Sequence, residues 1–432
     1  MTLAVSAMLA STAPAWAQTE LNIATVNNGD MIRMQKLTDD FTSKNPDIKL
    51  NWVTMEENIL RQRVTTDIAT KGGQYDILTI GLYETPIWAR QGWLVALENL
   101  GDDYDAEDIL PAIREAISID GKMYGAPFYG ESSMVLYRTD LFEDAGLTMP
   151  EAPTWDFIAD AARKITDRSI DLNGICLRGK AGWSENIAFI TAMSNSFGAR
   201  WFDEDWQPEF NGPEWKNTLQ FYVDLMQDAG PPGAASNGFN ENLALFQQGK
   251  CGIWIDATVA AGFVTDPKDS IVADKVGFAL APDNGLGKRS NWLGSWNLAI
   301  PAGSQKIEAA EKFLSWATSK HYTELVAASE GWANVPPGTR ISLYENPEYL
   351  EAAPFAKLTL DSMNAADPIN PTVKPVPYVG VYFVAIPEFQ GLGTIVGQLF
   401  SAALAGQSTV DEALAQAQEV SVREMTRGGY IK

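Results

Sequence analysis

The sequence predicts an α/β protein of two lobes, each built on a mainly parallel sheet flanked by helices. The chain has 432 residues, which is enough for two or three domains that each bury a core. Its 46% hydrophobic and 20% charged residues are typical of a water-soluble globular protein. Strand-like and helix-like runs alternate from residue 21 onward, which indicates parallel strands joined by helical crossovers.

The first unit follows the order strand, helix, strand, helix, strand. Apolar runs at 21–26, 48–52 and 77–80 predict the three strands. Apolar residues recur at helical spacing within 34–41, and residues 58–70 are also compatible with a helix. This βαβαβ order predicts parallel pairing of the three strands.

A second α/β unit is needed for the later part of the chain. Strand-like runs resume at 253–255, 276–280 and 297–300. No flexible linker separates the two units, so we expect several strands to cross between them. Loops 27–30 and 81–84 follow strands of the first unit, where open α/β sheets bind their ligands.

The composition excludes several classes of function. A net charge of −23 repels phosphate backbones and anionic lipids, so we expect no nucleic-acid partner. A single histidine, His321, excludes multi-histidine metal sites, and no P-loop, Rossmann or EF-hand pattern predicts a cofactor. The 14 Trp residues exceed what a core usually needs and favour a carbohydrate-like ligand.

The N-terminus predicts export. Residues 3–10 form a short apolar stretch, and Ala15-Trp16-Ala17 follows with the pattern at which signal peptidases cut, so residues 1–17 are predicted to be a signal peptide. The alternative is a buried N-terminal helix, against which Pro14 and the lack of a helical period argue. No cysteine follows the predicted cut after Ala17, so we expect an unlipidated protein in the periplasm.

The two cysteines leave one question open. Cys176 and Cys251 each lie in a strand-like run, and an oxidising compartment permits a disulfide between them. Two buried free thiols are the alternative, because the sequence does not say whether the two strands are neighbours.

A series of short segments runs along nearly the whole mature chain: YDIL (75–78), WARQGWL (88–94), GKMYGAP (121–127), LYRTDLF (136–142), AGL (145–147), TW (154–155), FQQGK (246–250), LAIP (298–301), AAEKFL (309–314) and PPGTR (336–340). In this order the segments resemble the family 1 solute-binding proteins of ABC importers. Three further segments, NNGD (27–30), NWLGSW (291–296) and GWAN (331–334), are most similar to those of binders of sugar alcohols such as sorbitol and mannitol.

The resemblance implies a two-lobed, type II-like periplasmic binding fold that closes on one small solute. It further implies delivery of a polyol or sugar to the membrane permease subunits of an ABC transporter by a monomeric binding protein. Crossings near 129–131, near 294–297 and after Arg340 would divide the mature chain into four segments. These are 18–130 and 294–340 in one lobe, and 131–293 and 341–432, with the C-terminal helices, in the other.

Three charged residues are candidates for the binding site. Glu131 can accept two hydrogen bonds from a vicinal diol, and the alternative is a solvated surface acid. Asp256 ends an apolar run, where it either reaches the cleft or caps the next helix. Arg340 could donate to hydroxyls or pair with a cleft carboxylate, and a surface salt bridge is the alternative.

Aromatic faces can stack on the carbon-bound hydrogens of a polyol. Four tryptophans are candidates for this role, and we expect at least one of them to be core: Trp183, Trp292, Trp296 and Trp332. The resemblance adds five residues to the site: Asn28, Asp30, Tyr83, Asn240 and Phe389.

Within the class of binding proteins, another mono- or disaccharide is the alternative ligand. Two other classes of function compete with a polyol importer, and the first is a carboxylate-dependent glycoside hydrolase. A free adhesive or structural protein would bind no small molecule tightly. We expect a binding protein without enzymatic activity.

Overall fold

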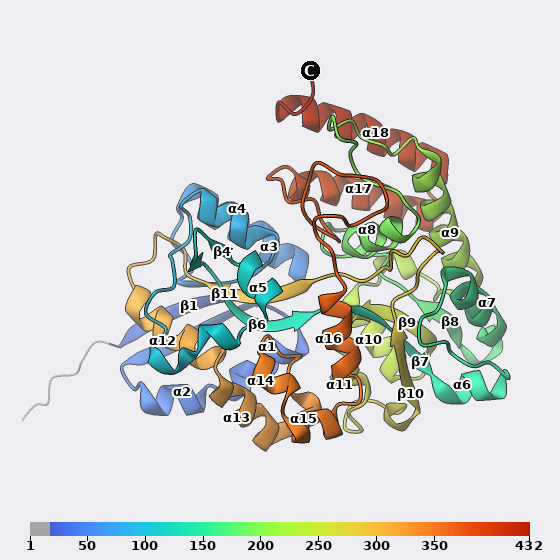
Figure 1. Cartoon of the computed structure of the whole chain (residues 1–432). Helices are drawn as coiled ribbons and strands as arrows, with labels where there is room; N and C mark the ends of the chain where they lie inside the picture. Colours follow the sequence, from blue (N-terminus) through green and yellow to red (C-terminus); the bar gives the residue numbers. More distant parts are fainter. Residues whose placement is uncertain (1–17) are drawn as a thin grey trace, which may run out of the picture.

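The computed structural model describes residues 18–432, and the predicted signal peptide at 1–17 lies outside the described residues. Two β-sheets lie side by side, each covered by helices, and the chain passes between them more than once (Figure 1). We call the first sheet with its helices the first lobe, and the second sheet with its helices the second lobe. This architecture confirms the predicted two-lobed α/β class.

The first sheet has the strand order β2-β1-β3-β11-β6. Strands β1, β2 and β3 pair in parallel, while β11 is antiparallel to both of its neighbours. The βαβαβ unit predicted from the sequence is therefore confirmed. The strands are β1 (Thr19–Val26), β2 (Ile48–Met55), β3 (Ile77–Gly81), β6 (Ala126–Glu131) and β11 (Gly294–Ala299), and a small hairpin is formed by β4 (Ser118–Ile119) and β5 (Lys122–Met123).

The second sheet has the strand order β10-β7-β9-β8. Only β7 runs against the others, because it is antiparallel to β9 and β10 while β8 and β9 are parallel. One strand in each sheet thus departs from the parallel arrangement. The strands are β7 (Ser133–Arg138), β8 (Asn173–Cys176), β9 (Cys251–Ala257) and β10 (Val276–Leu280).

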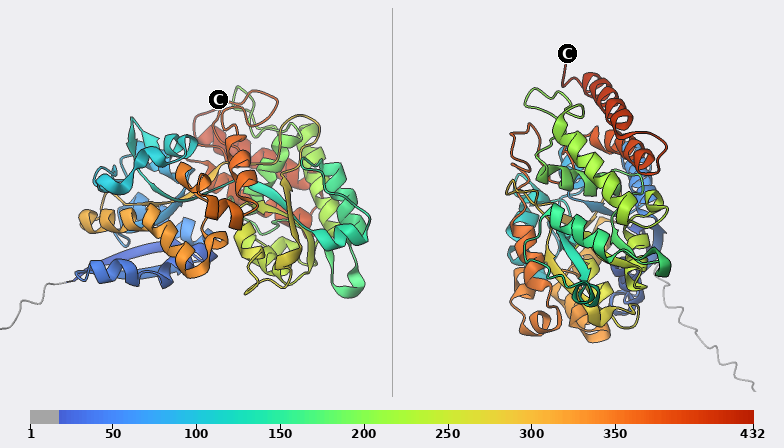
Figure 2. Two further views of the ribbon diagram at one scale, coloured as in Figure 1. Left: turned by 60° about the horizontal axis from the view of Figure 1, so that its bottom comes forward. Right: turned by 90° about the vertical axis from the view of Figure 1, so that its right-hand side faces the viewer.

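Helices cover both sheets, and the C-terminal helices α17 and α18 lie against α8 and α9 of the second lobe (Figure 2). Those of the first lobe are α1 (Gly29–Lys36), α2 (Asp39–Lys44), α3 (Glu57–Thr70), α4 (Glu84–Arg90), α5 (Pro111–Ala116), α12 (Ile307–Ala317) and α13 (Lys320–Glu330). The others are α6 (Thr139–Asp144), α7 (Trp155–Ile165), α8 (Asn186–Ser196), α9 (Pro213–Ala229), α10 (Phe239–Gln247), α11 (Ala260–Val264), α14 (Ile341–Tyr344), α15 (Pro347–Ala352), α16 (Ala356–Asn364), α17 (Phe389–Leu404) and α18 (Val410–Arg427). Short 3-10 turns are η1 (Asp102–Tyr104), η2 (Ala106–Asp108), η3 (Arg168–Ile170), η4 (Ala234–Ser236), η5 (Ala273–Lys275) and η6 (Trp332–Asn334).

Local chemistry explains where the helices near the interlobe cleft begin. The Asn28 side chain accepts a hydrogen bond from the backbone N–H of Met31 and caps α1. Glu56 caps α3 in the same way, so the chain turns sharply after β2. The single helix expected around 34–41 is instead two helices, α1 and α2, because the chain breaks at Leu37 and Thr38 before α2 begins.

The strands that link the lobes are held tightly at the crossing. Only Ser132 separates β6 from β7, and its backbone exchanges hydrogen bonds with Thr258. Its hydroxyl oxygen also accepts a hydrogen bond from the backbone N–H of Trp292, just before β11 begins. The crossing after Arg340 is less sharply defined, because α15 still packs against η6, whereas α16 contacts β6, β7 and β10. The lobe boundaries inferred from the sequence remain a prediction.

A disulfide joins Cys176 to Cys251, across the neighbouring strands β8 and β9 of the second sheet. The question that the sequence left open is thus answered in favour of a disulfide. Within residues 18–432, no helix is long and apolar enough to cross a membrane.

Candidate functional site

A cavity of about 250 Å³ lies between the two lobes. Its walls come from strands of the first sheet and the start of α3 on one side, and from α8, α10 and loops of the second lobe on the other, so closing or opening the lobes would change its shape. The residues that line it include Asn28, Glu56, Glu57, Arg61, Tyr129, Glu131, Arg178, Lys180, Ser184, Glu185, Phe239, Asn240, Glu241, Trp292, Ser295, Trp296 and Tyr382. This volume is near the lower end for small-molecule sites, which favours a compact ligand.

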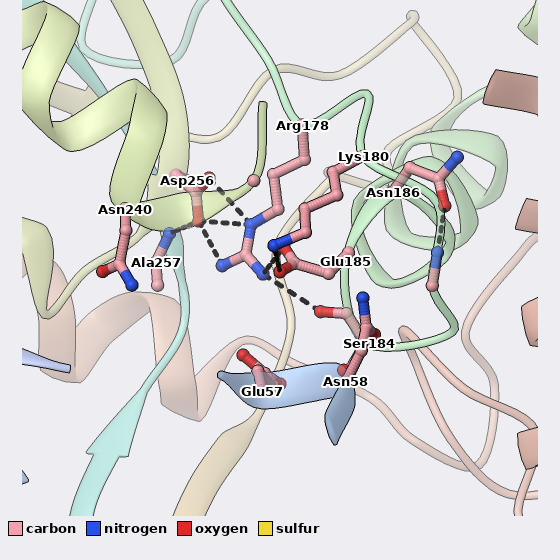
Figure 3. Close-up of polar contacts among 12 residues, drawn as sticks. Glu57, Asn58, Arg178, Lys180, Ser184, Glu185, Asn186, Asn240, Asp256 and Ala257 are labelled. Atoms are coloured by element: carbon pink, nitrogen blue, oxygen red, sulfur yellow. Dashed lines mark hydrogen bonds and ion pairs between the residues drawn. The ribbon is translucent and has the colours of Figure 1, made fainter. Parts of the chain in front are cut away.

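Arg178 and Asp256 form a buried ion pair at the carboxyl ends of two neighbouring strands. Arg178 follows β8 and Asp256 lies in β9. The Arg178 Nη2 lies 2.6 Å from the Asp256 Oδ1, and its Nε lies 2.9 Å from the Oδ2 (Figure 3). The Nη1 donates to the backbone carbonyl of Ser184 at 3.0 Å. These bonds fix the plane of the guanidinium at the cavity wall.

Glu131 ends β6 and lines the cavity without a hydrogen-bonding or ionic partner among residues 18–432. Burial raises the pKa of its carboxyl to about 8, and the nearby guanidinium of Arg178 only partly offsets this effect. A carboxyl group in such a position has its full capacity to accept hydrogen bonds from ligand hydroxyls.

Arg61 connects the lobes through its two faces. Its guanidinium lies 4.4 Å from the ring centre of Trp183 in the second lobe and 4.5 Å from that of Trp296 in the first. Two carboxylates hold its edges, Glu57 at 2.9 Å and Glu84 at 2.6 Å. Stacking on both faces and ion pairs at the edges leave Arg61 one orientation at the cavity wall.

A second charged group of the cavity wall, Lys180, bridges the lobes. The Lys180 Nζ lies 2.6 Å from the Glu56 Oε1 at the start of α3 and 3.8 Å from the Glu185 Oε1. Glu185 is 4% exposed, and its Oε2 has no hydrogen-bond partner within the described chain. Burial raises the pKa of Glu185 to about 8, against the opposing effect of Arg178. Figure 3 shows Lys180 and Glu185 converging beside Arg178.

Aromatic and amide groups complete the cavity wall. The Trp292 ring lies 5.8 Å from that of Tyr382, and both rings line the cavity together with Trp296. Asn28 donates through its Nδ2 to the Tyr129 hydroxyl at 3.1 Å. Asn240 of the second lobe donates to the backbone carbonyl of Asn27 at 3.0 Å, which is a further contact between the lobes.

The structure places five of the twelve predicted site residues on the cavity wall. These are Asn28, Glu131, Asn240, Trp292 and Trp296. Asp256 lies directly behind the wall, where it orients Arg178; it neither reaches into the cavity nor serves as a helix cap.

Three predicted residues form a buried aromatic cluster beside the cavity. The ring centres of Tyr83 and Trp183 are 4.8 Å apart, and Phe389 lies 6.0 Å and 6.1 Å from these two rings. The Tyr83 hydroxyl donates to the backbone carbonyl of Ile386 at 2.9 Å. This cluster joins the lobes and supports Arg61 from behind, and none of the three lines the cavity.

The other three predicted residues lie away from the cavity. Arg340 is 4% exposed and donates to the backbone carbonyls of Tyr104, Asp105 and Thr318, so its forked donors are occupied within the first lobe. The Asp30 Oδ1 lies 2.6 Å from the Arg33 Nη1. Trp332 is half-buried in η6. These three were expected in the cleft, but the structure gives them other contacts.

Much of the charged cavity wall was not predicted from the sequence. Arg178 directly follows the strand-like run at 174–177, so the rule applied to Asp256 could have found it. Glu57 and Arg61 lie one helical turn apart at the start of α3, which follows a strand of the first unit. Tyr382 comes from an irregular loop, and no sequence pattern marks it.

The arrangement can recognise a neutral, polyhydroxylated molecule. Carboxylates, guanidinium groups and amides supply acceptors and donors, and the tryptophan rings cover apolar C–H faces. Within residues 18–432, no cluster of His, Cys, Asp and Glu could hold a metal ion.

The sequence of the chain matches the model of the bacterial extracellular solute-binding protein family over residues 28–324. The chain belongs to this family. The predicted family membership is therefore confirmed, and the named relatives of this family member are binding proteins.

A mannitol-binding protein of Pseudomonas aeruginosa is 58% identical to this family member, over 95% of this chain and 94% of the relative. A solute-binding protein of an ABC transporter from Agrobacterium vitis, solved with bound D-mannitol, is 73% identical with a TM-score of 0.95; the match covers 96% of this chain and all of that one. A ribitol complex from Agrobacterium radiobacter is 25% identical with a TM-score of 0.83, covering 94% and 98% of the two chains.

Proposed function

We propose that this protein is the substrate-binding component of an ABC importer and that it captures a hexitol of the mannitol and sorbitol class. The observation that carries the proposal is the cavity between the lobes, whose wall combines Glu131, which has no partner among residues 18–432, with the fixed guanidinium of Arg178 and with tryptophan faces. The mannitol complex at 73% identity supports the same ligand class.

The cavity explains why a polyol would bind. Each hydroxyl of a hexitol can donate to a carboxylate and accept from a guanidinium or amide at the same time. Glu131 offers acceptors that no protein group uses, and the aromatic rings of Trp292 and Trp296 can cover the carbon chain. A volume of about 250 Å³ favours one small polyol over an oligosaccharide.

The cellular role follows from the family and from the ligand. The protein would bind the polyol in the periplasm, as a monomer without catalytic activity, and release it to the permease subunits of the transporter. Export would use residues 1–17 as a signal peptide cut after Ala17.

A thermal-shift panel tests the proposal. A ligand that binds only the native state stabilises it by about 2.7 kcal/mol at a hundredfold excess over Kd. Mannitol or sorbitol should raise the melting temperature, whereas maltose and nucleotides should leave it unchanged. Calorimetric titration with mannitol, sorbitol and arabitol would then rank the ligands. A shift with maltose alone would favour the disaccharide alternative, and no shift with any polyol or sugar would contradict the proposal.

A further inference from the structure

The charged groups around the cavity are unbalanced. Five carboxylates line it, from Glu56, Glu57, Glu131, Glu185 and Glu241, against the three cations Arg61, Arg178 and Lys180.

Each of the three cations already has a carboxylate partner. Arg61 is held by Glu84 at 2.6 Å, as well as by Glu57. Arg178 and Lys180 have ion pairs of 2.6 Å with Asp256 and Glu56 respectively. No cation of the wall is left for an anionic ligand, because Glu84 and Asp256 approach from behind it.

Two of the carboxylates keep oxygens that nothing in the described chain satisfies. Glu131 has no partner at all, and the buried Oε2 of Glu185 accepts no hydrogen bond. Glycines make room for both groups. An added Cβ at Gly294 would lie 3.0 Å from the Glu131 Cγ, and one at Gly238 would lie 2.6 Å from the Glu185 Oε2. A side chain at position 294 or 238 would therefore push the Glu131 or the Glu185 carboxyl group out of its place.

We propose that the cavity takes polyols that carry a protonated amine, and that it binds them more tightly than neutral polyols of the same shape while rejecting carboxylated ones. The inference rests on the proposed function, because it assigns a charged substrate class to the same site. An ammonium group beside Glu131 would gain a charge-assisted hydrogen bond to a largely buried carboxyl group. A carboxylate there would find every cation of the wall already paired, and it could lie beside Glu131 only while Glu131 keeps its proton.

The symmetry of D-mannitol determines which ligands the test compares. D-Mannitol has a twofold axis, so its two terminal carbons are equivalent and a single change at one end gives one compound. Calorimetric titration of the full mature chain would compare mannitol with 1-deoxy-D-mannitol, 1-amino-1-deoxy-D-mannitol and D-mannonate. The affinity for the ammonium compound should be on the order of tenfold higher than the affinity for the deoxy compound, because only the ammonium group can form a charge-assisted hydrogen bond with Glu131. Mannonate should bind at least tenfold more weakly than mannitol.

The release of a proton from Glu131 on ligand binding gives a second measurement. Glu131 has a pKa raised to about 8, so most of the unliganded protein holds a proton there at pH 7. An ammonium group beside it should displace that proton, and the binding heat should then depend on the ionisation enthalpy of the buffer. Glu131→Gln should remove this dependence and most of the tenfold preference, whereas Glu308→Gln, at an 87% exposed position in α12, should retain both.

The outcomes separate the two proposals. If mannitol and 1-deoxy-D-mannitol bind but the ammonium compound has no advantage, the charged class is wrong and the polyol function stands. If mannonate binds as tightly as mannitol, the charged class is wrong as well. If neither neutral compound binds, the proposed function fails, and this inference fails with it.

Discussion

Arg178 and Asp256 form an ion pair in which both side chains are at least nine-tenths buried. Two hydrogen bonds at 2.6 and 2.9 Å join the guanidinium to the carboxylate, and a third contact to the Oδ1 lies at 3.1 Å. A buried charge needs such a partner, because losing one member leaves the other desolvated and uncompensated. The pair thus stabilises the fold, and it also orients the Arg178 guanidinium at the cavity wall.

Replacing Asp256 with asparagine should therefore affect both folding and binding. We expect Asp256→Asn to lower the free energy of unfolding by about 3 to 5 kcal/mol, the usual cost of breaking a buried pair. Mannitol affinity should also fall, because Arg178 would lose its fixed orientation. Urea denaturation and calorimetry measure the two effects. Unchanged stability, with Glu308→Gln as the exposed control, would contradict the structural role of the pair.

Glu131→Gln should separate binding from folding. The substitution keeps the shape of the side chain but, at pH 9, where a group with a pKa of about 8 is ionised, it removes a charge-assisted acceptor, which is worth about 1.5 to 3 kcal/mol. Mannitol affinity should then fall on the order of tenfold to a hundredfold. Stability without ligand should stay the same or rise, since a desolvated carboxyl group is removed. Calorimetry beside an unliganded melting curve measures both, and unchanged affinity would remove Glu131 from the site.

Stability without ligand should decrease as the pH rises from about 5 to 8. Burial raises the pKa of Glu131 and of Glu185 to about 8, and that of Asp30 to about 6. The native state therefore holds more protons than the unfolded state between the ordinary carboxyl pKa and these values, so the free energy of unfolding falls as protons leave.

At acid pH the dependence reverses. Hydrogen bonds from His321, Trp316 and Lys44 hold the pKa of Asp40 at about 2 despite partial desolvation, so its contribution is lost as the pH falls from about 4 towards 2. Urea midpoints at pH 3, 5, 6.5 and 8 should thus peak near pH 5. Glu131→Gln should flatten the decline above pH 5. A midpoint that rises between pH 5 and 8 would contradict the assignment.

The fold could be predicted because its signals are local. The apolar residues of β1 and β3 are mostly buried, β2 is an edge strand that is buried only at Ile48 and Met55, and the alternation of the three strands with helices dictates parallel pairing. The break between α1 and α2 was missed, since the apolar spacing at 34, 37 and 41 continues across it. Spacing reports which face is buried and does not report where the backbone bends.

The site was only partly predictable because it is made of pairs from distant segments. Arg61 is positioned by Trp183 and Trp296, which lie 122 and 235 residues further along the chain. Arg340 has the chemistry of a ligand-binding residue, but the carbonyls of Tyr104 and Thr318 occupy its donors. A sequence shows which side chains could bind a hydroxyl, whereas only the fold shows which of them are still free.

Reduction of the disulfide should destabilise the second lobe. Cys176 and Cys251 close a loop with a sequence separation of 75 residues, and such a bond typically contributes about 2 to 4 kcal/mol. Cys176→Ala with Cys251→Ala should lower the urea midpoint and make it insensitive to dithiothreitol, while the wild-type midpoint should fall when the reductant is added. Equal midpoints for oxidised and reduced wild-type protein would contradict a stabilising bond.

The ion pair between Lys180 and Glu56 should stabilise the conformation in which the two lobes are closed. It joins the second lobe to the start of α3 at 2.6 Å, and the side chains are 27% and 39% exposed. A partly exposed pair is worth about 0.2 to 1 kcal/mol, so Glu56→Gln should weaken mannitol binding by about twofold to fivefold, mainly through faster dissociation. Stopped-flow kinetics measures the rate.

Small-angle X-ray scattering tests the same ion pair through the radius of gyration. Mannitol should reduce the radius of gyration of the wild-type protein, because a ligand enclosed by both lobes must enter while they are apart. Glu56→Gln should reach the same compact radius, but only at a higher mannitol concentration. The pair Lys216 and Asp411 joins α9 to α18 within the second lobe, so Asp411→Asn provides a control that should leave the mannitol dependence unchanged. An unchanged radius with saturating ligand would indicate a rigid, preformed cavity, and the ion pair would then have no closing motion to stabilise.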